Sequence, residues 1–397
     1  MTNGEQVPTT ECRVCHTDVP AGDFCGLCGC HLTRRRWEGP DWLRLRDFSA
    51  APNESVLSPS LASSLFPHLA HRGAFRFGLA ALLVSIVACA VLRLPAALIA
   101  VAVLGLPTLF LIYLRESDAF RDLPARTVAL TAVLGIALGI GWVLLSGAVA
   151  APSSSVAVGA GVGGAQMLRD GVGLSLGAAI LVILPALIVR LLGPPTREAL
   201  DGFMIGALGS LMCTGAATLT RLIPQLRTGV VSKTPMSHFL VEAGIRGITV
   251  PLIAAAAGGL IGAALWFRRP ENTEHQHPGA VRLVLVLFST AVLLVYVSLG
   301  LVDVSRMGQW LMLAVYVAVA VVALMALRLG LHLALLHEAH DEIEADEPLL
   351  CAHCGHIVPD MAFCPACGVA TRASSRTSRK LRRRMRPERV DPEPEQP

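Results

Sequence analysis

Residues 75–114 read FRFGLAALLVSIVACAVLRLPAALIAVAVLGLPTLFLIYL, two long apolar segments joined by the link Arg93-Leu94-Pro95. Each segment is close to the roughly 20 apolar residues that an α-helix needs to cross the hydrocarbon core of a bilayer. A link this short forces the chain to reverse at once, so the sequence predicts a transmembrane helical hairpin. The residues that follow repeat the alternation of apolar segments and polar links.

Further apolar segments of this length continue to residue 327, and together they predict an all-α polytopic membrane helix bundle of about eight transmembrane helices. The composition agrees, because 53% of the residues are hydrophobic and 16% are charged, whereas about a quarter are charged in soluble proteins. The fifth and eighth segments are the shortest. The expected spans are 75–92, 94–114, 127–150, 172–192, 202–219, 247–267, 283–302 and 310–327.

Glycines recur at four-residue spacing within three of these spans, and such pairs let helix backbones approach closely. They predict tight packing within one bundle, or alternatively an oligomer of several copies. The pairs are Gly135 with Gly139, Gly202 with Gly206, and Gly258 with Gly262.

Ionisable residues avoid the centres of the expected spans, where no Asp, Glu, His or Lys is found. Such groups are costly in lipid and mark proton paths and catalysis, so the sequence offers no residues for acid–base chemistry within the membrane. Serine and threonine there are expected to bond to their own helix. The link at 220–246 differs, because it mixes basic and apolar residues. It predicts an amphipathic interfacial segment or a re-entrant cap, where a ligand or partner would dock from outside.

Four cysteines near the beginning of the chain have the spacing C-x2-C-x9-C-x2-C, which is typical of tetrahedral zinc sites. They are Cys12, Cys15, Cys25 and Cys28. A segment of this size buries too little apolar surface to fold without its metal. Nearby His16, Cys30 and His31 are alternative ligands.

A second quartet repeats this spacing near the end of the chain: Cys351, Cys354, Cys364 and Cys367. Neighbouring residues repeat as well, since Val358-Pro359 and Phe363 match Val19-Pro20 and Phe24. The sequence therefore predicts a duplicated zinc ribbon and two zinc ions, one per four-cysteine site. Each quartet closes its own site, or the knuckles are exchanged between the two arms.

The expected orientation places both termini in the cytoplasm of a multi-pass protein of the cell (plasma) membrane. Eight spans put both termini on one side, and zinc thiolates favour a reducing compartment. The basic residues of the links decide little, but the arginine-rich arms favour the cytoplasmic side.

The chain outside the membrane domain at 72–327 divides by composition. We expect a disordered segment at 1–10, the N-terminal zinc ribbon at 11–31, a basic and Pro/Ser-rich linker at 32–71, an amphipathic acidic helix at 328–348, the C-terminal zinc ribbon at 349–370, and a disordered tail, basic and then acidic, at 371–397.

Residues 197–208 open a span with Asp201-Gly202 followed by Gly206-Ala207, and residues 246–266 add Pro251 and a helix of small residues. These stretches resemble the PrsW-type intramembrane proteases, over about residues 170–305. The chain also resembles zinc-ribbon multi-pass membrane proteins of the actinobacterial type.

The catalytic pattern of the PrsW-type family does not carry over to this chain. A Glu-Glu pair is expected where the chain has residues 184–190, a Glu-Asn pair where it has Ala217-Thr218, and a His where it has Ile253-Ala254. Only Asp303 could match the last acidic residue of the family's pattern. The resemblance therefore implies a non-catalytic relative, and no catalytic or cofactor-binding residue is assigned.

The function that the sequence favours is a scaffold or regulatory role, in which paired cytoplasmic zinc ribbons bind a protein partner. The alternatives are a transporter or transport accessory, and a diverged intramembrane protease; on balance the chain is not expected to be an enzyme. Besides the lipid bilayer itself, the arginine-rich arms predict contact with anionic lipid, and nucleic acid is less favoured. These arms hold Arg34, Arg35, Arg36, Arg44 and Arg46, and then Arg372, Arg376, Arg379, Arg382, Arg383, Arg384 and Arg386.

Overall fold

The computed structural model describes residues 8–13, 17–27, 31–32, 65, 73–116, 123–150, 172–193, 198–228, 236–267, 278–304, 307–338, 348–351, 354–361 and 363–368. The chain forms two compact units. One comprises Met1–Pro59, Pro270–Thr273 and Leu335–Pro397, and holds both ribbons. The other comprises Ser60–Arg269 and Glu274–Ala334, and is the membrane domain.

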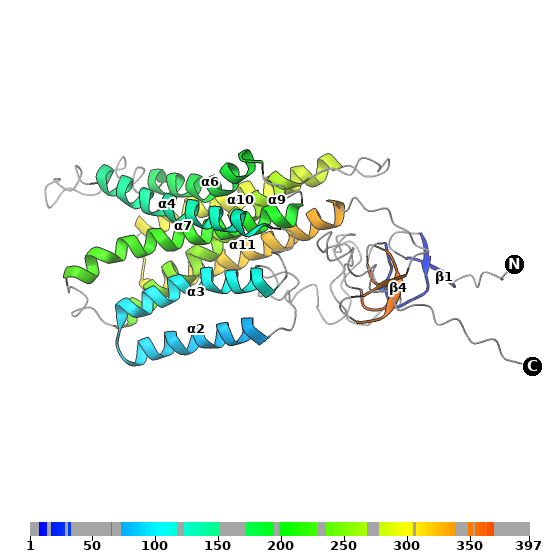
Figure 1. Cartoon of the computed structure of the whole chain (residues 1–397), viewed down its shortest axis with the longest axis horizontal. Helices are drawn as coiled ribbons and strands as arrows, with labels where there is room; N and C mark the ends of the chain where they lie inside the picture. Colours follow the sequence, from blue (N-terminus) through cyan, green and yellow to red (C-terminus); the bar gives the residue numbers. More distant parts are fainter. Residues whose placement is uncertain are drawn as a thin grey trace, which may run out of the picture. The chain divides into compact units, whose positions relative to one another are not determined.

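The membrane domain is a bundle of long helices (Figure 1). They are α2 (Gly73–Val91), α3 (Pro95–Glu116), α4 (Ala125–Ala150), α6 (Leu174–Leu191), α7 (Ala199–Thr228), α8 (Met236–Glu242), η6 (Ala243–Thr249), α9 (Val250–Trp266), α10 (Pro278–Val304) and α11 (Gln309–Glu338). Segments α8, η6 and α9 run on as one span, so the described residues contain eight helices long and apolar enough to cross a membrane. The predicted fold class, a polytopic helix bundle, is confirmed.

Helices α2 and α3 form the predicted hairpin and lie side by side (Figure 1). The reversal depends on Arg93, whose φ of 53° lies in the left-handed region. The amide of Arg93 donates to the carbonyl of Ala90 over 3.2 Å, and that of Leu94 donates to Cys89 over 2.9 Å. These bonds satisfy carbonyls at the end of α2, as in other left-handed helix caps.

Helices α7 and α9 form the centre of the bundle. In their spans 72% and 67% of the residues are buried, against 6% for the span of α2. They approach through glycines, because a Cβ atom on Gly206 would collide with the carbonyl of Gly258, and one on Gly202 with that of Gly262. The glycine spacing seen in the sequence thus serves packing inside one bundle.

The third glycine pair joins α4 to α7 in the same way. A Cβ atom on Gly135 would lie 2.6 Å from the carbonyl oxygen of Gly209, and one on Gly139 would collide with the carbonyl of Cys213. All three pairs are therefore occupied by contacts between helices of the same chain.

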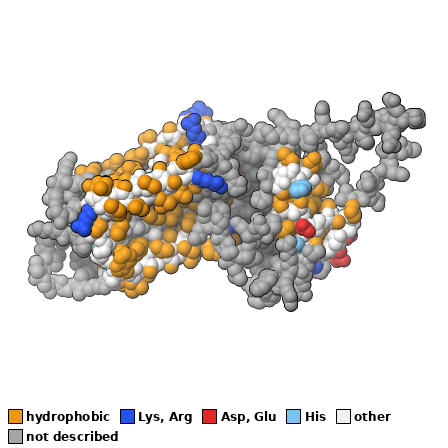
Figure 2. Space-filling view, turned by 90° about the horizontal axis from the view of Figure 1, so that it is seen from below, with side chains coloured by type: hydrophobic (Ala, Val, Ile, Leu, Met, Phe, Trp, Pro, Cys, Tyr) orange, Lys and Arg blue, Asp and Glu red, His pale blue; other side chains and the backbone are white. Residues whose placement is uncertain are grey.

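Apolar side chains cover the outside of the bundle. Figure 2 shows one face that is mostly hydrophobic, with basic side chains towards its borders. Phe77 and Val91 of α2 and Leu294 of α10 are more than half exposed. A surface of this kind suits contact with lipid tails and agrees with a multi-pass membrane protein.

Serine and threonine hydroxyls inside the spans bond mainly to the helix that carries them, as expected. Thr218 donates to Thr214 over 2.9 Å, Thr249 to Ile245 over 2.9 Å and Ser289 to Leu285 over 2.7 Å. These hydroxyls are satisfied one turn away, so they do not by themselves mark a polar path through the bundle.

Two expectations about the spans are wrong. The fifth and eighth were expected to be the shortest, but they extend over Ala199–Pro224 and Gln309–Leu331, 26 and 23 residues. The sixth was expected at 247–267, whereas its helix begins at Met236. At the fifth and sixth spans, polar residues at a span end were read as a link although they continue the helix; at the eighth, the residues expected to form an amphipathic helix from 328 belong to α11 as far as Glu338.

The two ribbons have matching hairpins. In the N-terminal ribbon, β1 (Thr9–Glu11) pairs antiparallel with β2 (Asp18–Pro20); in the C-terminal ribbon, β3 (Pro348–Leu350) pairs with β4 (Ile357–Pro359). Thr9 lies opposite Pro20, and Pro348 opposite Pro359, so the register repeats as well. Strand β1 reaches back into residues 1–10, for which disorder was expected, because it completes this hairpin. The linker apart from residues 32 and 65, all of residues 339–347, and the tail lie outside the described residues.

Candidate functional site

The C-terminal quartet forms one compact cluster of sulfur atoms. The ligand atoms of Cys351, Cys354, Cys364 and Cys367 all lie within 4.8 Å of one another. The sulfurs of Cys351 and Cys367 are 3.6 Å apart, and those of Cys354 and Cys364 are 3.9 Å apart. A tetrahedral zinc ion with bonds of about 2.3 Å needs sulfurs about 3.8 Å apart. The cluster therefore has the size of a four-thiolate metal site.

The local structure explains how these thiols come together. The amide of Cys351 donates to His356 over 2.9 Å, and the turns are completed by Gly355 and Gly368, whose φ values are 71° and 72°. Hydrogen bonding to Cys351 and burial raise the pKa of the Cys364 thiol. A bound divalent cation would reverse this effect by stabilising the thiolate.

The N-terminal quartet is only partly within the described residues. Cys12 and Cys25 are buried beside Val19, which matches the packing of Cys351 and Cys364 beside Val358. Cys15 and Cys28 lie outside the described residues, as do His16 and Cys30. The ring of His31 packs on Phe24 with centroids 4.5 Å apart. A second metal site at this end stays a prediction.

The two ribbons contact each other through a reciprocal pair of backbone hydrogen bonds. The amide of Phe24 donates to the carbonyl of Pro365 over 2.9 Å, and the amide of Phe363 donates to that of Gly26 over 2.8 Å. In the sequence repeat, Phe24 corresponds to Phe363, and Gly26 corresponds to Pro365. One contact is therefore made twice with the roles exchanged, as in a two-fold symmetric dimer.

Side chains at this ribbon interface differ between the two copies of the repeat. A Cβ atom on Gly22 would lie 2.9 Å from the carbonyl oxygen of Pro365, and one on Gly26 would collide with Met361. The counterparts of Gly22 and Gly26 in the repeat are Met361 and Pro365. Each glycine thus makes room for a larger residue opposite, so the interface favours unlike ribbons over two identical ones.

The membrane domain contains a polar cavity of about 380 Å³. Its walls come from the C-terminal parts of α4, α7 and α10, the N-terminal parts of α6 and α11, and the segments α8 and η6, so it lies at one end of the bundle. The ionisable or hydroxyl-bearing residues lining it include Arg221, His238, Glu242, Arg246, Asp303 and Tyr316. This cavity is at the end of the bundle opposite to the first turn of α2 and the last turn of α11.

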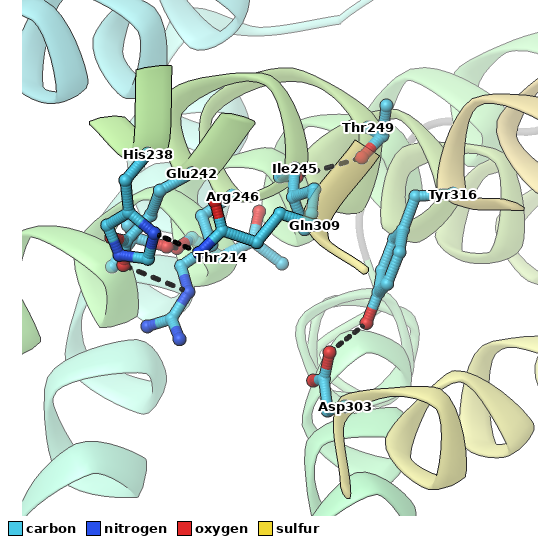
Figure 3. A network of polar contacts seen from close by, with 10 residues as sticks. Thr214, His238, Glu242, Ile245, Arg246, Thr249, Asp303, Gln309 and Tyr316 are labelled. Atoms are coloured by element: carbon cyan, nitrogen blue, oxygen red, sulfur yellow. Dashed lines mark hydrogen bonds and ion pairs between the residues drawn. The ribbon is translucent and has the colours of Figure 1, made fainter. Parts of the chain in front are cut away.

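One polar cluster in the cavity follows α8 and η6 (Figure 3). An oxygen of Glu242 lies 3.7 Å from Nε2 of His238, and the other lies 3.5 Å from Nε of Arg246. The amide nitrogen of Gln309 contacts Nδ1 of His238 at 2.7 Å. When that amide donates, Nδ1 accepts, and the ring proton on Nε2 is directed to Glu242. Glu242 is therefore shared by two basic neighbours.

A second polar pair joins α10 to α11. The hydroxyl of Tyr316 donates to a carboxylate oxygen of Asp303 over 2.7 Å, and Tyr316 is only 2% exposed. Figure 3 shows this pair apart from the Glu242 cluster.

Segment η6, which carries Arg246, is a π-helix. π-Helical turns are rare and occur often at functional sites. The wide turn lies where the sixth span passes the cavity, between the polar residues of α8 and the buried small residues of α9.

Sequence reasoning had singled out the 220–246 link as a docking place, and the structure brings Arg221, His238, Glu242 and Arg246 of that link to the cavity. It had not predicted that Asp303 and Tyr316 would lie in the same site as these residues. It had also placed Glu242 outside any span, whereas Glu242 belongs to the sixth. The sequence did contain a sign that these residues continue the helix: His238, Glu242 and Arg246 are spaced one helical turn apart, along a single face.

Comparison with known proteins finds no matching family model, and no curated protein or solved structure resembles the chain closely enough to suggest a relation. The resemblance to PrsW-type proteases stays a prediction.

Proposed function

We propose that this multi-pass membrane protein is a scaffold or regulatory protein, and that its two zinc ribbons form a single partner-binding module. The observation that carries this proposal is the reciprocal contact between Phe24 and Pro365 and between Phe363 and Gly26. A module built from both chain ends presents a composite surface that neither ribbon has alone.

The ribbon pair supports the expected orientation of the chain. Ribbons that touch must lie on the same side of the membrane, and an even number of spans has this result. The described cysteines form no disulfide, which suits a reducing compartment. We therefore place both termini in the cytoplasm, at the plasma membrane, with two zinc ions and with the arginine-rich arms on the anionic leaflet.

We retain the interpretation of a non-catalytic relative of the PrsW-type proteases. Thr218, at the position where a Glu-Asn pair is expected, lines the cavity together with Asp303. Asp303 is engaged by Tyr316 and Glu242 by Arg246.

The test is affinity purification of cross-linked full-length protein from membranes, read by quantitative mass spectrometry. Cys351→Ser removes a metal ligand, whereas Gly22→Val leaves every cysteine in place and obstructs Pro365. Ile357→Ser, at a residue 54% exposed on β4, is the control for a change in ribbon surface.

A scaffold that needs the paired module loses the same partner in both Cys351→Ser and Gly22→Val, while Ile357→Ser retains it. Membrane levels and the unfolding temperature of each variant are measured first. A set of partners identical in all four proteins would contradict the proposal.

A further inference from the structure

The polar cavity holds charged groups that do not all neutralise one another. Glu242 lies within 4 Å of both Arg246 and His238. Asp303 is bonded to Tyr316, a neutral phenol. Among the described residues, no carboxylate lies within ion-pair distance of Arg221. Arg221 and Asp303 both line the cavity, without an ion pair between them.

The cavity thus offers a cationic position and an anionic position on different helices. Arg221 is on α7 and Asp303 is on α10, and both line the same space. Arg246 adds a second guanidinium to the lining of the same cavity. Two guanidinium groups around one space repel each other, and an anion between them would relieve that repulsion.

The charges select between classes of occupant. A simple anion would be attracted by Arg221 and Arg246 but repelled by Asp303. A simple cation would suit Asp303 but would face two arginines. A molecule with both charges, the anion towards Arg221 and the ammonium towards Asp303, satisfies both positions at once. Guanidinium groups bind phosphate oxygens well, in pairs of hydrogen bonds.

The remaining walls and the size agree with such an occupant. Trp142, Ile245, Leu299 and Met312 supply apolar surface, and about 380 Å³ is within the range of small-molecule sites. The cavity also lies at an end of the bundle, where both lipid headgroups and dissolved molecules are found.

We propose that this cavity binds a zwitterionic phosphate ester, with its phosphate held by Arg221 and Arg246 and its ammonium group held by Asp303. This proposal is independent of the ribbons. The ester is carried either by a phospholipid headgroup or by a free small molecule, since both present the same two charges.

The experiment is calorimetric titration of the purified full-length protein in dodecyl maltoside. The zwitterionic probe is glycerophosphoethanolamine. Glycerol 3-phosphate and ethanolamine are its counterparts with charge of one sign only: the first, mostly a dianion at pH 7, lacks the ammonium group, and the second lacks the phosphate. The wild type is expected to bind glycerophosphoethanolamine at least tenfold more tightly than either counterpart. Equal or tighter binding of glycerol 3-phosphate would overturn the proposal.

Variants then test the assigned residues. Arg221→Gln and Asp303→Asn should each weaken the binding of glycerophosphoethanolamine at least tenfold, and Asp303→Asn should not weaken that of glycerol 3-phosphate. Arg282→Gln, at the opposite end of α10, is the matched control and should bind as the wild type does. Wild-type affinity in either cavity variant would refute the assignment. If a variant does not fold, the comparison of the three probes on the wild type decides.

Dioctanoyl phosphatidylethanolamine distinguishes the two sources. Where glycerophosphoethanolamine binds as expected, tighter binding of this lipid indicates a lipid headgroup, and weaker binding or none indicates a free ester; both results support the proposed chemistry. If neither probe binds, the proposal fails, whatever the ribbons do.

Discussion

The backbone amide of Phe24 donates to the carbonyl of Pro365 over 2.9 Å, although the two residues belong to opposite ends of the chain. Its counterpart joins Phe363 to Gly26, so the ribbon interface has an internal two-fold relation. Gly22 makes this interface possible, because any side chain there meets the backbone of Pro365.

Gly22→Val is expected to separate the ribbons while leaving each one folded. The obstructing atoms are the carbonyl group and the Cβ of Pro365, which the backbone and the proline ring hold in place, so they cannot move away as a flexible side chain would. Hydrogen–deuterium exchange should become faster at the amides of Phe24 and Phe363. The amide of Cys351, which bonds within its own ribbon, should remain protected. Unchanged exchange at Phe24 would show that the pair does not form in solution.

Zinc content tests whether each quartet closes its own site. The wild type is expected to contain two zinc ions per chain, and Cys364→Ser should lose one of them because the remaining three thiolates leave the tetrahedron open. Cys12→Ser should lose the other. Elemental analysis of the purified proteins measures this directly. Loss of both ions in either single variant would favour exchanged knuckles, and an absence of zinc from the wild type would exclude the metal.

Gly139→Ala tests the packing of α4 on α7. The new methyl group meets the carbonyl of Cys213 and should destabilise the bundle by about 1–3 kcal/mol, as overpacking does. Gly141→Ala is the control, because nothing lies within 4 Å of its added Cβ atom. Gly141→Ala should be neutral or slightly stabilising, since alanine favours a helix over glycine. Thermal unfolding in detergent compares the two; similar unfolding temperatures would contradict the packing argument.

Tyr316→Phe removes the hydroxyl that donates to Asp303. A hydrogen bond to a charged group contributes about 1.5–3 kcal/mol, so a clear fall in unfolding temperature is expected. Tyr296→Phe is the matched control, because Tyr296 also lines the cavity and its hydroxyl has no hydrogen-bond partner among the residues the structure describes. The two variants should differ; equal effects would mean that the Asp303 bond contributes little.

Labelling of introduced cysteines tests the orientation. Gly308 precedes α11 at the cavity end, and nothing lies within 4 Å of its added Cβ atom, whereas Arg282 lies at the opposite end of the bundle. In intact cells, a membrane-impermeant maleimide should label Gly308→Cys but not Arg282→Cys. Permeabilised cells should show labelling of both. The reverse pattern in intact cells would place the cavity in the cytoplasm and both ribbons outside.

Much of the membrane domain could be predicted from the sequence, for physical reasons that particular residues illustrate. A run of apolar residues near bilayer length has few alternatives to a spanning helix, and Arg93-Leu94-Pro95 is too short for anything but a reversal. The glycine pairs likewise predicted close packing between helices. Their spacing alone could not indicate which helix each pair would contact. Gly202 and Gly206 of α7 meet α9 rather than a second copy of the chain.

The cavity could not be assembled from the sequence, because its parts come from span ends. His238, Glu242 and Arg246 look like an interfacial segment when considered alone. Asp303 and Tyr316 lie in different spans and become neighbours only when α10 and α11 pack together. The ribbon pair is a similar case, since the repeat indicates two like modules, and only the opposed positions of Gly22 and Pro365 show that they fit each other.

The contact between Phe24 and Pro365 also constrains the order of biosynthesis. The two residues are separated by about 340 positions, which is a very long loop for a folding contact to close. While a ribosome is still producing the helices, the first ribbon has been made and the second has not. In a nascent chain that stops before Cys364, the amide of Phe24 lacks its partner carbonyl, and Gly22 and Gly26 beside it remain uncovered. Formation of the ribbon pair is then a late event, and it distinguishes a finished chain from a truncated one.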